Sequence, residues 1–276
     1  MLKTLMILHR CCWLAFLVIL VAGFFLDFTS LWGWLAIALA IVLRVTLGRI
    51  LAPARGADPE PPVEVEPPVT GRWSALNSPT SRVPSHGVRA YGQAYAIDLV
   101  AEPEDRPRPR FGWWPVVRRN RAFPGFGAPL LAAADGTVLR AVDRNRDHLS
   151  RNSWPALVYL IFEGLFREIV GPGQLLGNHL ILDLGGGRYA AYAHLRRGSL
   201  LVRPGDRVRI GQQVAECGNS GNSSEPHVHF QLMDNPDLDV ARGIPFTWRE
   251  IGVPANGEVV TVGPAAAPSG TGDATR

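Results

Sequence analysis

The residues best suited to chemistry lie in one stretch, Gly218-Asn-Ser-Gly-Asn-Ser-Ser-Glu-Pro-His227-Val-His229. A turn-rich loop there runs directly into a strand with a His-X-His pattern. Alternate strand residues share a face, so His227 and His229 are expected to lie side by side. Two such imidazoles suit a metal ion, or a metal ion with a neighbouring acid–base group. Histidines at this spacing are also common on strand surfaces, so the pattern needs partners elsewhere in the chain.

Three upstream side chains are candidate partners. Asp98 interrupts an apolar strand predicted over 94–100, where a carboxylate is costly to bury alone. His86 lies in a loop before a glycine, and His194 ends a strand-like run. Each has an ordinary alternative: an edge or ion-paired aspartate, a loop histidine, and a partly buried histidine. His179, on another predicted strand, is a reserve candidate.

Together these groups favour a metal-dependent hydrolytic site. Two histidines and one carboxylate, such as His86, Asp98 and His229, suit a catalytic zinc ion that keeps one position for water. The remaining imidazoles, His194 and His227, suit transfer of a water proton and support of charge on an attacked carbonyl. Spacing alone does not say which histidine of the His-X-His pair binds the metal.

Further motifs follow one another in order between residues 77 and 233. They are Ser85-His-Gly87, Tyr95-Ala-Ile-Asp98, the segment 127–138, Gly177-Asn178, Tyr192-Ala-His-Leu195, the segment 202–208, Gly211-Gln212 and the loop and strand 218–230. In this order they resemble the lysostaphin-like zinc metallopeptidases, which cleave peptide bonds in bacterial peptidoglycan. The order of the motifs is far more specific than any one of them.

The resemblance implies a mainly β catalytic domain whose antiparallel sheets form a groove. It implies Zn²⁺ as the cofactor, with His86, Asp98 and His229 as ligands and His194 and His227 as the catalytic pair. The implied substrate is a peptidoglycan peptide. The alternative is a non-catalytic module of the same fold that binds cell wall or regulates a hydrolase. Such relatives typically lack one or more ligands, whereas all five positions are filled here.

Two departures from the family pattern affect this expectation. Eleven residues separate His86 from Asp98, whereas the best-known members have only a few there. An insertion near 143–170 also contains the segment Trp154–Val170, which lacks strand alternation. That segment is predicted to be a helix or an apolar insertion that packs against the domain or touches the membrane surface.

The N-terminal region is predicted to be a retained membrane anchor, residues 1–50. Residues 11–43 are almost wholly apolar except at 27–30. Two spans, roughly 11–27 and 31–48, fit a transmembrane helical hairpin, near the lower end of the ~17–25 residues that a span needs. The apolar region is too long for a signal peptide, and no small-residue cleavage site follows it.

The remaining regions divide by composition. Residues 51–70 are a Pro/Glu-rich linker, predicted to hold the domain clear of the membrane. Residues 71–263 form the catalytic domain of short strands and turns, and 264–276 are a disordered tail. Within the domain, one hairpin is predicted to turn at Asp135-Gly136, and another at 185–187.

Charge and cysteine content limit the partners. The formal net charge is +4 over 276 residues, from scattered arginines, so no nucleic-acid partner is expected. Of three cysteines only Cys217 lies outside the anchor, and it is predicted to be a small buried residue. No protein partner follows from the sequence.

The orientation in the bacterial cell membrane has two opposing indications. Lys3, Arg10, Arg44 and Arg49 flank the spans, which favours cytoplasmic placement of both ends. In the cytoplasm the substrate would be a different peptide. We give the implied substrate more weight and expect the catalytic domain to be extracytoplasmic.

Overall fold

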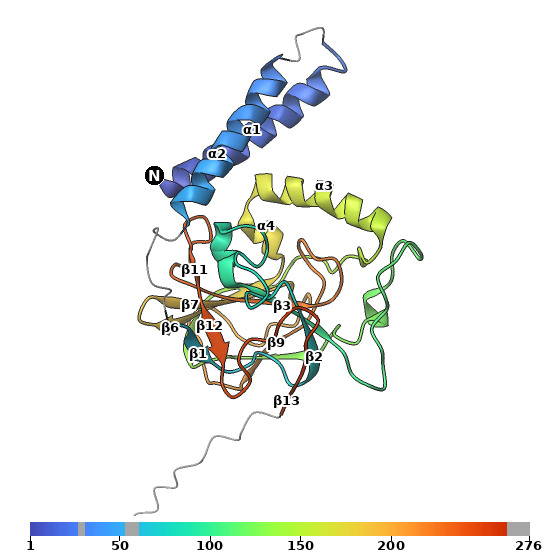
Figure 1. Cartoon of the computed structure of the whole chain (residues 1–276), viewed down its shortest axis with the longest axis vertical. Coiled ribbons are helices and arrows are strands. Elements are labelled where there is room, and N and C mark those ends of the chain that lie inside the picture. Colours follow the sequence, from blue (N-terminus) through green and yellow to red (C-terminus); the bar gives the residue numbers. More distant parts are fainter. Residues whose placement is uncertain (27–30, 53–60, 264–276) are drawn as a thin grey trace, which may run out of the picture.

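The computed structural model describes residues 1–26, 31–52 and 61–263. The predicted break between the spans at 27–30, residues 53–60 of the predicted linker, and the predicted tail at 264–276 lie outside the described residues. Two N-terminal helices project from a β domain, and a third long helix, α3 (Trp154–Val170), lies beside the base of this helical pair and over the β domain (Figure 1).

The N-terminal pair consists of α1 (Leu2–Ala22) and α2 (Leu31–Ile50), which pack along each other. By length and composition alone, both are apolar and long enough to cross a membrane. Most of their side chains point away from the rest of the protein, since only 17% and 22% of their apolar windows are buried. Their mutual contact includes a buried cluster of Cys12, Ala40 and Leu43.

The β domain is built around a nine-stranded sheet in the order β13-β2-β3-β10-β7-β6-β5-β8, with β11 paired to β10. Every pairing in this sheet is antiparallel. A small antiparallel sheet joins β4 to β9, and β1 pairs in parallel with β12. The expected fold class, a mainly β domain with an N-terminal helical hairpin, is confirmed.

The element bounds are as follows. The strands are β1 Val63–Val65, β2 Gly71–Leu76, β3 Ile97–Ala101, β4 Pro129–Leu131, β5 Gly136–Val142, β6 His179–Gly185, β7 Arg188–Ala193, β8 Arg207–Val208, β9 Gln213–Glu216, β10 Val228–Met233, β11 Gly243–Ile244, β12 Phe246–Trp248 and β13 Val259–Val262. Besides α1 and α2, the helices are η1 Ala90–Tyr95, η2 Asn120–Ala122, α3 Trp154–Val170 and α4 Pro172–Leu176.

Strand alternation separates the core from the site. In β10, Val228, Phe230 and Leu232 are fully buried in the main hydrophobic core. The residues between them, His229 and Gln231, face the opposite side of the sheet. Because one strand face supplies the core, the register that buries the apolar set also fixes where the two polar side chains emerge.

Local strand patterns predicted some pairings and missed others. The hairpin turning at 185–187 is confirmed as β6–β7. The hairpin turning at Asp135-Gly136 is wrong, because β4 pairs with β9 while β5 pairs with β6 and β8. The strand predicted over 94–100 begins only at Ile97, since 3-10 helix occupies 90–95.

The helical hairpin contacts the domain directly, contrary to the prediction of a separating linker. Arg10 of α1 makes a two-pronged ion pair with Asp239, at 2.8 and 3.0 Å. Lys3 pairs with Asp237 at 2.6 Å. The C-terminal part of the predicted linker also differs, because Val63–Val65 form β1 and Val65 is buried in the main core. The domain therefore sits against the base of the hairpin.

Candidate functional site

Three adjacent strands bring the candidate residues together. His229 of β10 lies opposite Asp98 of β3 in the ladder, and opposite Ala193 of β7 on its other side. Directly opposed residues in antiparallel strands share a face at close range. The small Ala193 side chain lines the cavity beside the histidines. Strand register alone therefore places His229 against the Asp98 carboxylate.

His86 reaches the same place from a loop. The loop is closed by a hydrogen bond from the Ser85 amide to the carbonyl of Ala94, at 3.0 Å. Gly87, at φ +73°, occupies the left-handed region that favours glycine. The eleven intervening residues, including η1, fold back on themselves, so the long spacing still brings His86 to Asp98.

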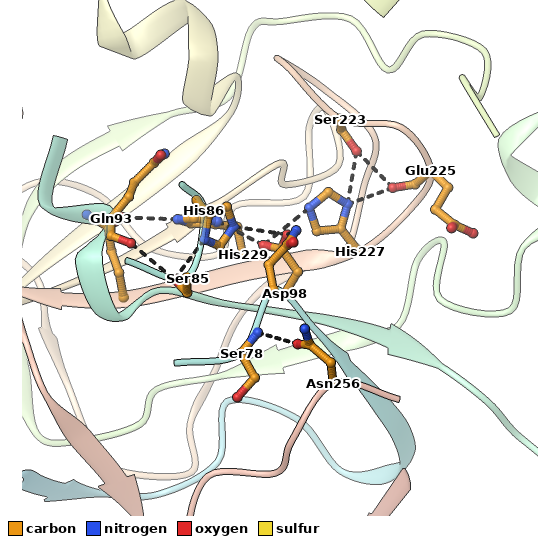
Figure 2. A network of polar contacts seen from close by, with 12 residues as sticks. Ser78, Ser85, His86, Gln93, Asp98, Ser223, Glu225, His227, His229 and Asn256 are labelled. Carbon is orange, nitrogen blue, oxygen red and sulfur yellow. Dashed lines mark hydrogen bonds and ion pairs between the residues drawn. The ribbon is translucent and has the colours of Figure 1, made fainter. Parts of the chain in front are cut away.

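His86, Asp98 and His229 form a candidate metal centre (Figure 2). Asp98 Oδ2 lies 3.0 Å from His86 Nε2, and Asp98 Oδ1 lies 2.9 Å from His229 Nδ1. One donor atom from each residue falls within 4.8 Å of the others. The predicted ligand triplet is thus a compact pair of imidazoles around one carboxylate, and this donor set fits a zinc ion.

A second layer of groups orients these three side chains. The Ser85 hydroxyl lies 3.0 Å from His86 Nδ1, and Asn77 Nδ2 donates to Asp98 Oδ2 at 2.8 Å. The Gln231 side-chain oxygen lies 2.9 Å from His229 Nε2, while its nitrogen donates to the Tyr91 carbonyl. Because the amide is held at both ends, its oxygen is placed to accept from Nε2 of His229, and Nδ1, which faces Asp98, is the nitrogen that would bind a metal.

The two remaining histidines lie side by side at the edge of this centre. The rings of His194 and His227 are 4.6 Å apart between centroids. His194 Nδ1 donates to the Ser220 carbonyl, and His227 Nδ1 donates to the Glu225 carbonyl, at 2.9 and 2.8 Å. In the neutral rings, Nε2 is therefore the nitrogen that can accept a proton.

His194 owes its position to a local break in the strand. The alternation of β7 predicts that His194 shares a face with Tyr192, which is buried in the main core. Instead β7 ends at Ala193, and His194 has φ +61°, a conformation uncommon for residues with a side chain. Its ring therefore lies on the cavity side, beside His227, and not in the core.

Burial and neighbouring groups set the charges of the site. Burial alone would raise the pKa of Asp98, but His86 and His227, with hydrogen bonds from His229 and His86, hold that pKa well below its ordinary value. Burial, with His227 and His229 nearby, lowers the pKa of His194 well below its ordinary value. Burial also lowers the pKa of His227, against the attraction of Asp98. The site therefore holds an ionised carboxylate beside two neutral rings at neutral pH.

All five candidates line one cavity of about 360 Å³. Part of its wall comes from segments that the strand motifs do not include. Leu157, Leu160 and Glu168 of α3 line it, as does Arg44 of α2. The helix predicted within Trp154–Val170 therefore covers the candidate site, and the base of the helical hairpin contributes to it.

The other singled-out residues lie outside this cavity. His179, the reserve candidate, is buried, and its Nδ1 contacts the Gly177 carbonyl at 2.8 Å. Cys217 is fully buried in the core, where burial raises the pKa of its thiol. The sequence did not predict that Asn77, Ser85 and Gln231 would contact the side chains of the candidate metal centre. Only Gln231 carried a signal, because it continues the alternation of His227 and His229.

Part of the β domain matches a known protein family. Residues 156–239 match the model of Peptidase family M23. Over that region the chain is similar to peptidase family M23. The matched region contains His194, His227 and His229, and it begins within α3. The resemblance drawn from the motifs is thus confirmed at the level of the family.

A curated relative of this region is the peptidoglycan DD-endopeptidase ShyA of Vibrio cholerae. It is 30% identical over 78 residues, which make up 28% of this chain and 16% of the relative. The chain therefore matches only a small part of that protein's length.

Two solved structures illustrate the structural likeness. The catalytic domain of lysostaphin from Staphylococcus simulans is 22% identical and covers 49% of this chain and 85% of its own, with a TM-score of 0.29. A zinc-containing peptidase from Vibrio cholerae is 19% identical and covers 68% of this chain and 39% of its own, with a TM-score of 0.31.

Proposed function

We propose that this chain is a zinc-dependent metalloendopeptidase that cleaves peptide bonds of bacterial peptidoglycan. The observation that carries the proposal is the complete set of groups on one cavity: the His86–Asp98–His229 triplet with His194 and His227 beside it. The M23 family match and the name of the Vibrio cholerae relative, a peptidoglycan DD-endopeptidase, support the same reaction and substrate class.

In this proposal His86, Asp98 and His229 hold the zinc ion. When bound, zinc would lower the pKa of a water molecule and polarise a carbonyl. The chain supplies the proton transfers. Nε2 of His194 or His227 accepts one proton of the attacking water, and the protonated ring then donates that same proton to the nitrogen of the leaving amine as the C–N bond breaks. Hydrogen bonds from Nδ1 to backbone carbonyls keep both rings oriented for this role.

Hydrolysis can be tested on purified peptidoglycan sacculi with the full chain in detergent. We expect new free amino termini to appear, and we expect a chelator to prevent them until Zn²⁺ is restored. Binding to sacculi without new amino termini, at full zinc occupancy, would instead support a non-catalytic cell-wall module of the same fold.

We further propose that the hairpin anchors the chain in the bacterial cell membrane with the M23 domain extracytoplasmic, where peptidoglycan lies. Strand β13, which carries the exposed Thr261, lies at the end of the domain away from the hairpin (Figure 1). In spheroplasts, a Thr261→Cys variant lacking Cys11 and Cys12 should react with a membrane-impermeant maleimide before lysis. Reaction only after lysis would place the domain in the cytoplasm, as the flanking charges favour.

A further inference from the structure

Helix α3 exposes an apolar surface on its outer side. Every fourth residue from Trp154 to Val170 is exposed, and Phe162 at the centre of this series is 60% exposed. Side chains four residues apart line one face of a helix. The exposed large apolar residues of α3 are Trp154, Val158, Tyr159, Ile161, Phe162, Phe166 and Val170. This set is called the outer face of α3.

The charged residues of α3 point the opposite way. They are Glu163, Arg167 and Glu168, with side-chain exposures of 20%, 19% and 22%. Glu163 pairs with Arg151 at 2.9 Å, and Arg167 pairs with Glu163 at 3.3 Å. A helix on a water-facing surface shows the reverse arrangement, with charges outward and apolar groups inward. The outer face of α3 is therefore built for an apolar environment.

A neighbouring loop extends this surface with aromatic side chains. Trp113 and Trp114 are 71% and 80% exposed. Phe111 packs edge-on against Trp154 at 4.9 Å between centroids, and Trp113 lies 6.2 Å from the same ring. Tryptophan is enriched where membranes meet water. The same segment carries the exposed residues Arg110, Arg119 and Arg121, which suit anionic lipid headgroups.

The base of the hairpin places this surface at the edge of the apolar spans. Glu168 of α3 lies 3.7 Å from Arg44 of α2 and 3.6 Å from His9 of α1. Arg10, the last charge before the apolar part of α1, is paired with Asp239 of the domain. Because Arg10 and Arg44 bound the apolar stretch and both contact the domain, the boundary of the spans coincides with the side of the domain that carries α3 (Figure 1).

We propose that the outer face of α3 and the Trp113–Trp114 loop insert into the interface of the bilayer that holds the hairpin. The inference rests on the membrane anchorage proposed above, and it is independent of hydrolysis. Leu157 and Leu160, on the inner side of the same helix, line the candidate catalytic cavity. Helix α3 thus separates the cavity from the lipid, so substrate reaches the site close to the membrane surface.

The test uses the full chain in vesicles of phosphatidylcholine and phosphatidylglycerol. Cys11 and Cys12 are replaced by alanine, and the fully buried Cys217 is kept. An environment-sensitive fluorophore is attached to a Phe162→Cys variant, and in a matched control to Thr261→Cys on β13. Flotation reports anchorage, and quenching by lipids brominated near the headgroup end of their acyl chains reports insertion. We expect both variants to float. Only the label at 162 should shift its emission to the blue, and only that label should lose most of its fluorescence when the brominated lipids are present.

Each other outcome overturns the inference in a recognisable way. If the chain floats but the label at 162 stays in water, the face is not in lipid and remains open to a protein partner. If the chain does not float, the proposed anchorage fails as well. A Phe166→Glu substitution added to the labelled chain should abolish quenching at 162 while flotation persists. Unchanged quenching would show that the label merely lies near lipid.

Discussion

Replacing Asp98 with asparagine is expected to abolish zinc binding and hydrolysis while the fold is kept. The carboxylate lies between His86 and His229, at 3.0 and 2.9 Å, and its low pKa keeps it ionised. Asparagine has nearly the same volume but no charge. Losing an outer-shell partner of a metal ligand typically costs ~10–100-fold in affinity, so loss of a ligand should cost more than ~100-fold. Zinc content, measured by elemental analysis, and release of amino termini should fall together.

Two companion variants make this result interpretable. Gln231→Ala keeps the three ligands but removes the amide that orients His229 and donates to the Tyr91 carbonyl, so zinc affinity should fall by ~10–100-fold. Asp105→Asn changes an exposed aspartate outside the cavity and should alter neither zinc content nor turnover. Full zinc occupancy in a folded Asp98→Asn protein would contradict the proposed ligand set.

Replacing His194 or His227 with alanine is expected to leave zinc bound and to lower kcat by roughly 10²–10⁴-fold, the usual contribution of general acid–base catalysis. Neither residue belongs to the compact ligand triplet. Both rings line the cavity with Nδ1 held by a backbone carbonyl. Burial lowers the pKa of each imidazole, so both are neutral at pH 7 and able to accept a proton.

The control for these variants is another buried histidine. His179→Asn removes a ring outside the cavity whose Nε2 has no partner among the described residues. It should keep both zinc and turnover. If His194→Ala lost zinc in proportion to activity, His194 would act as a ligand, and the division between metal-binding and proton-transferring histidines would have to be redrawn.

Predictions from the sequence agree with the structure where they depend on neighbouring residues, and they fail where they depend on segments far apart in the chain. The neighbourhood of His227 and His229 depends on strand alternation, which neighbouring residues impose, and the prediction that they share one site agrees with the structure. The Asp135-Gly136 hairpin was wrong because an alternating run does not specify its partner strand. There, the Ala132 amide bonds to the Gln212 carbonyl, and Gly136 packs against Asp183 of β6.

The position of His194 shows a similar limit. Its ring reaches the cavity because β7 ends one residue earlier and the backbone turns to φ +61°. Alternation predicts the opposite face. The turn is supported by a hydrogen bond from the His194 amide to the Leu176 carbonyl, which strand periodicity does not encode. Motif order still made His194 a candidate, because the resemblance rests on several segments taken together and not on strand alternation.

The sequence by itself determined the chemical groups, namely two imidazoles and a carboxylate suited to a metal, two further imidazoles, and two apolar spans. These depend on residue type and short-range periodicity. Only the tertiary structure decided that α3 and the base of the hairpin enclose those groups. The contacts responsible, such as the pairing of Arg10 with Asp239 across 229 positions, join segments whose local patterns carry no information about each other. The sequence likewise does not show which neighbours the two faces of α3 have. In the folded chain one face lines the cavity, and Glu168 of the same helix lies beside Arg44 of the hairpin.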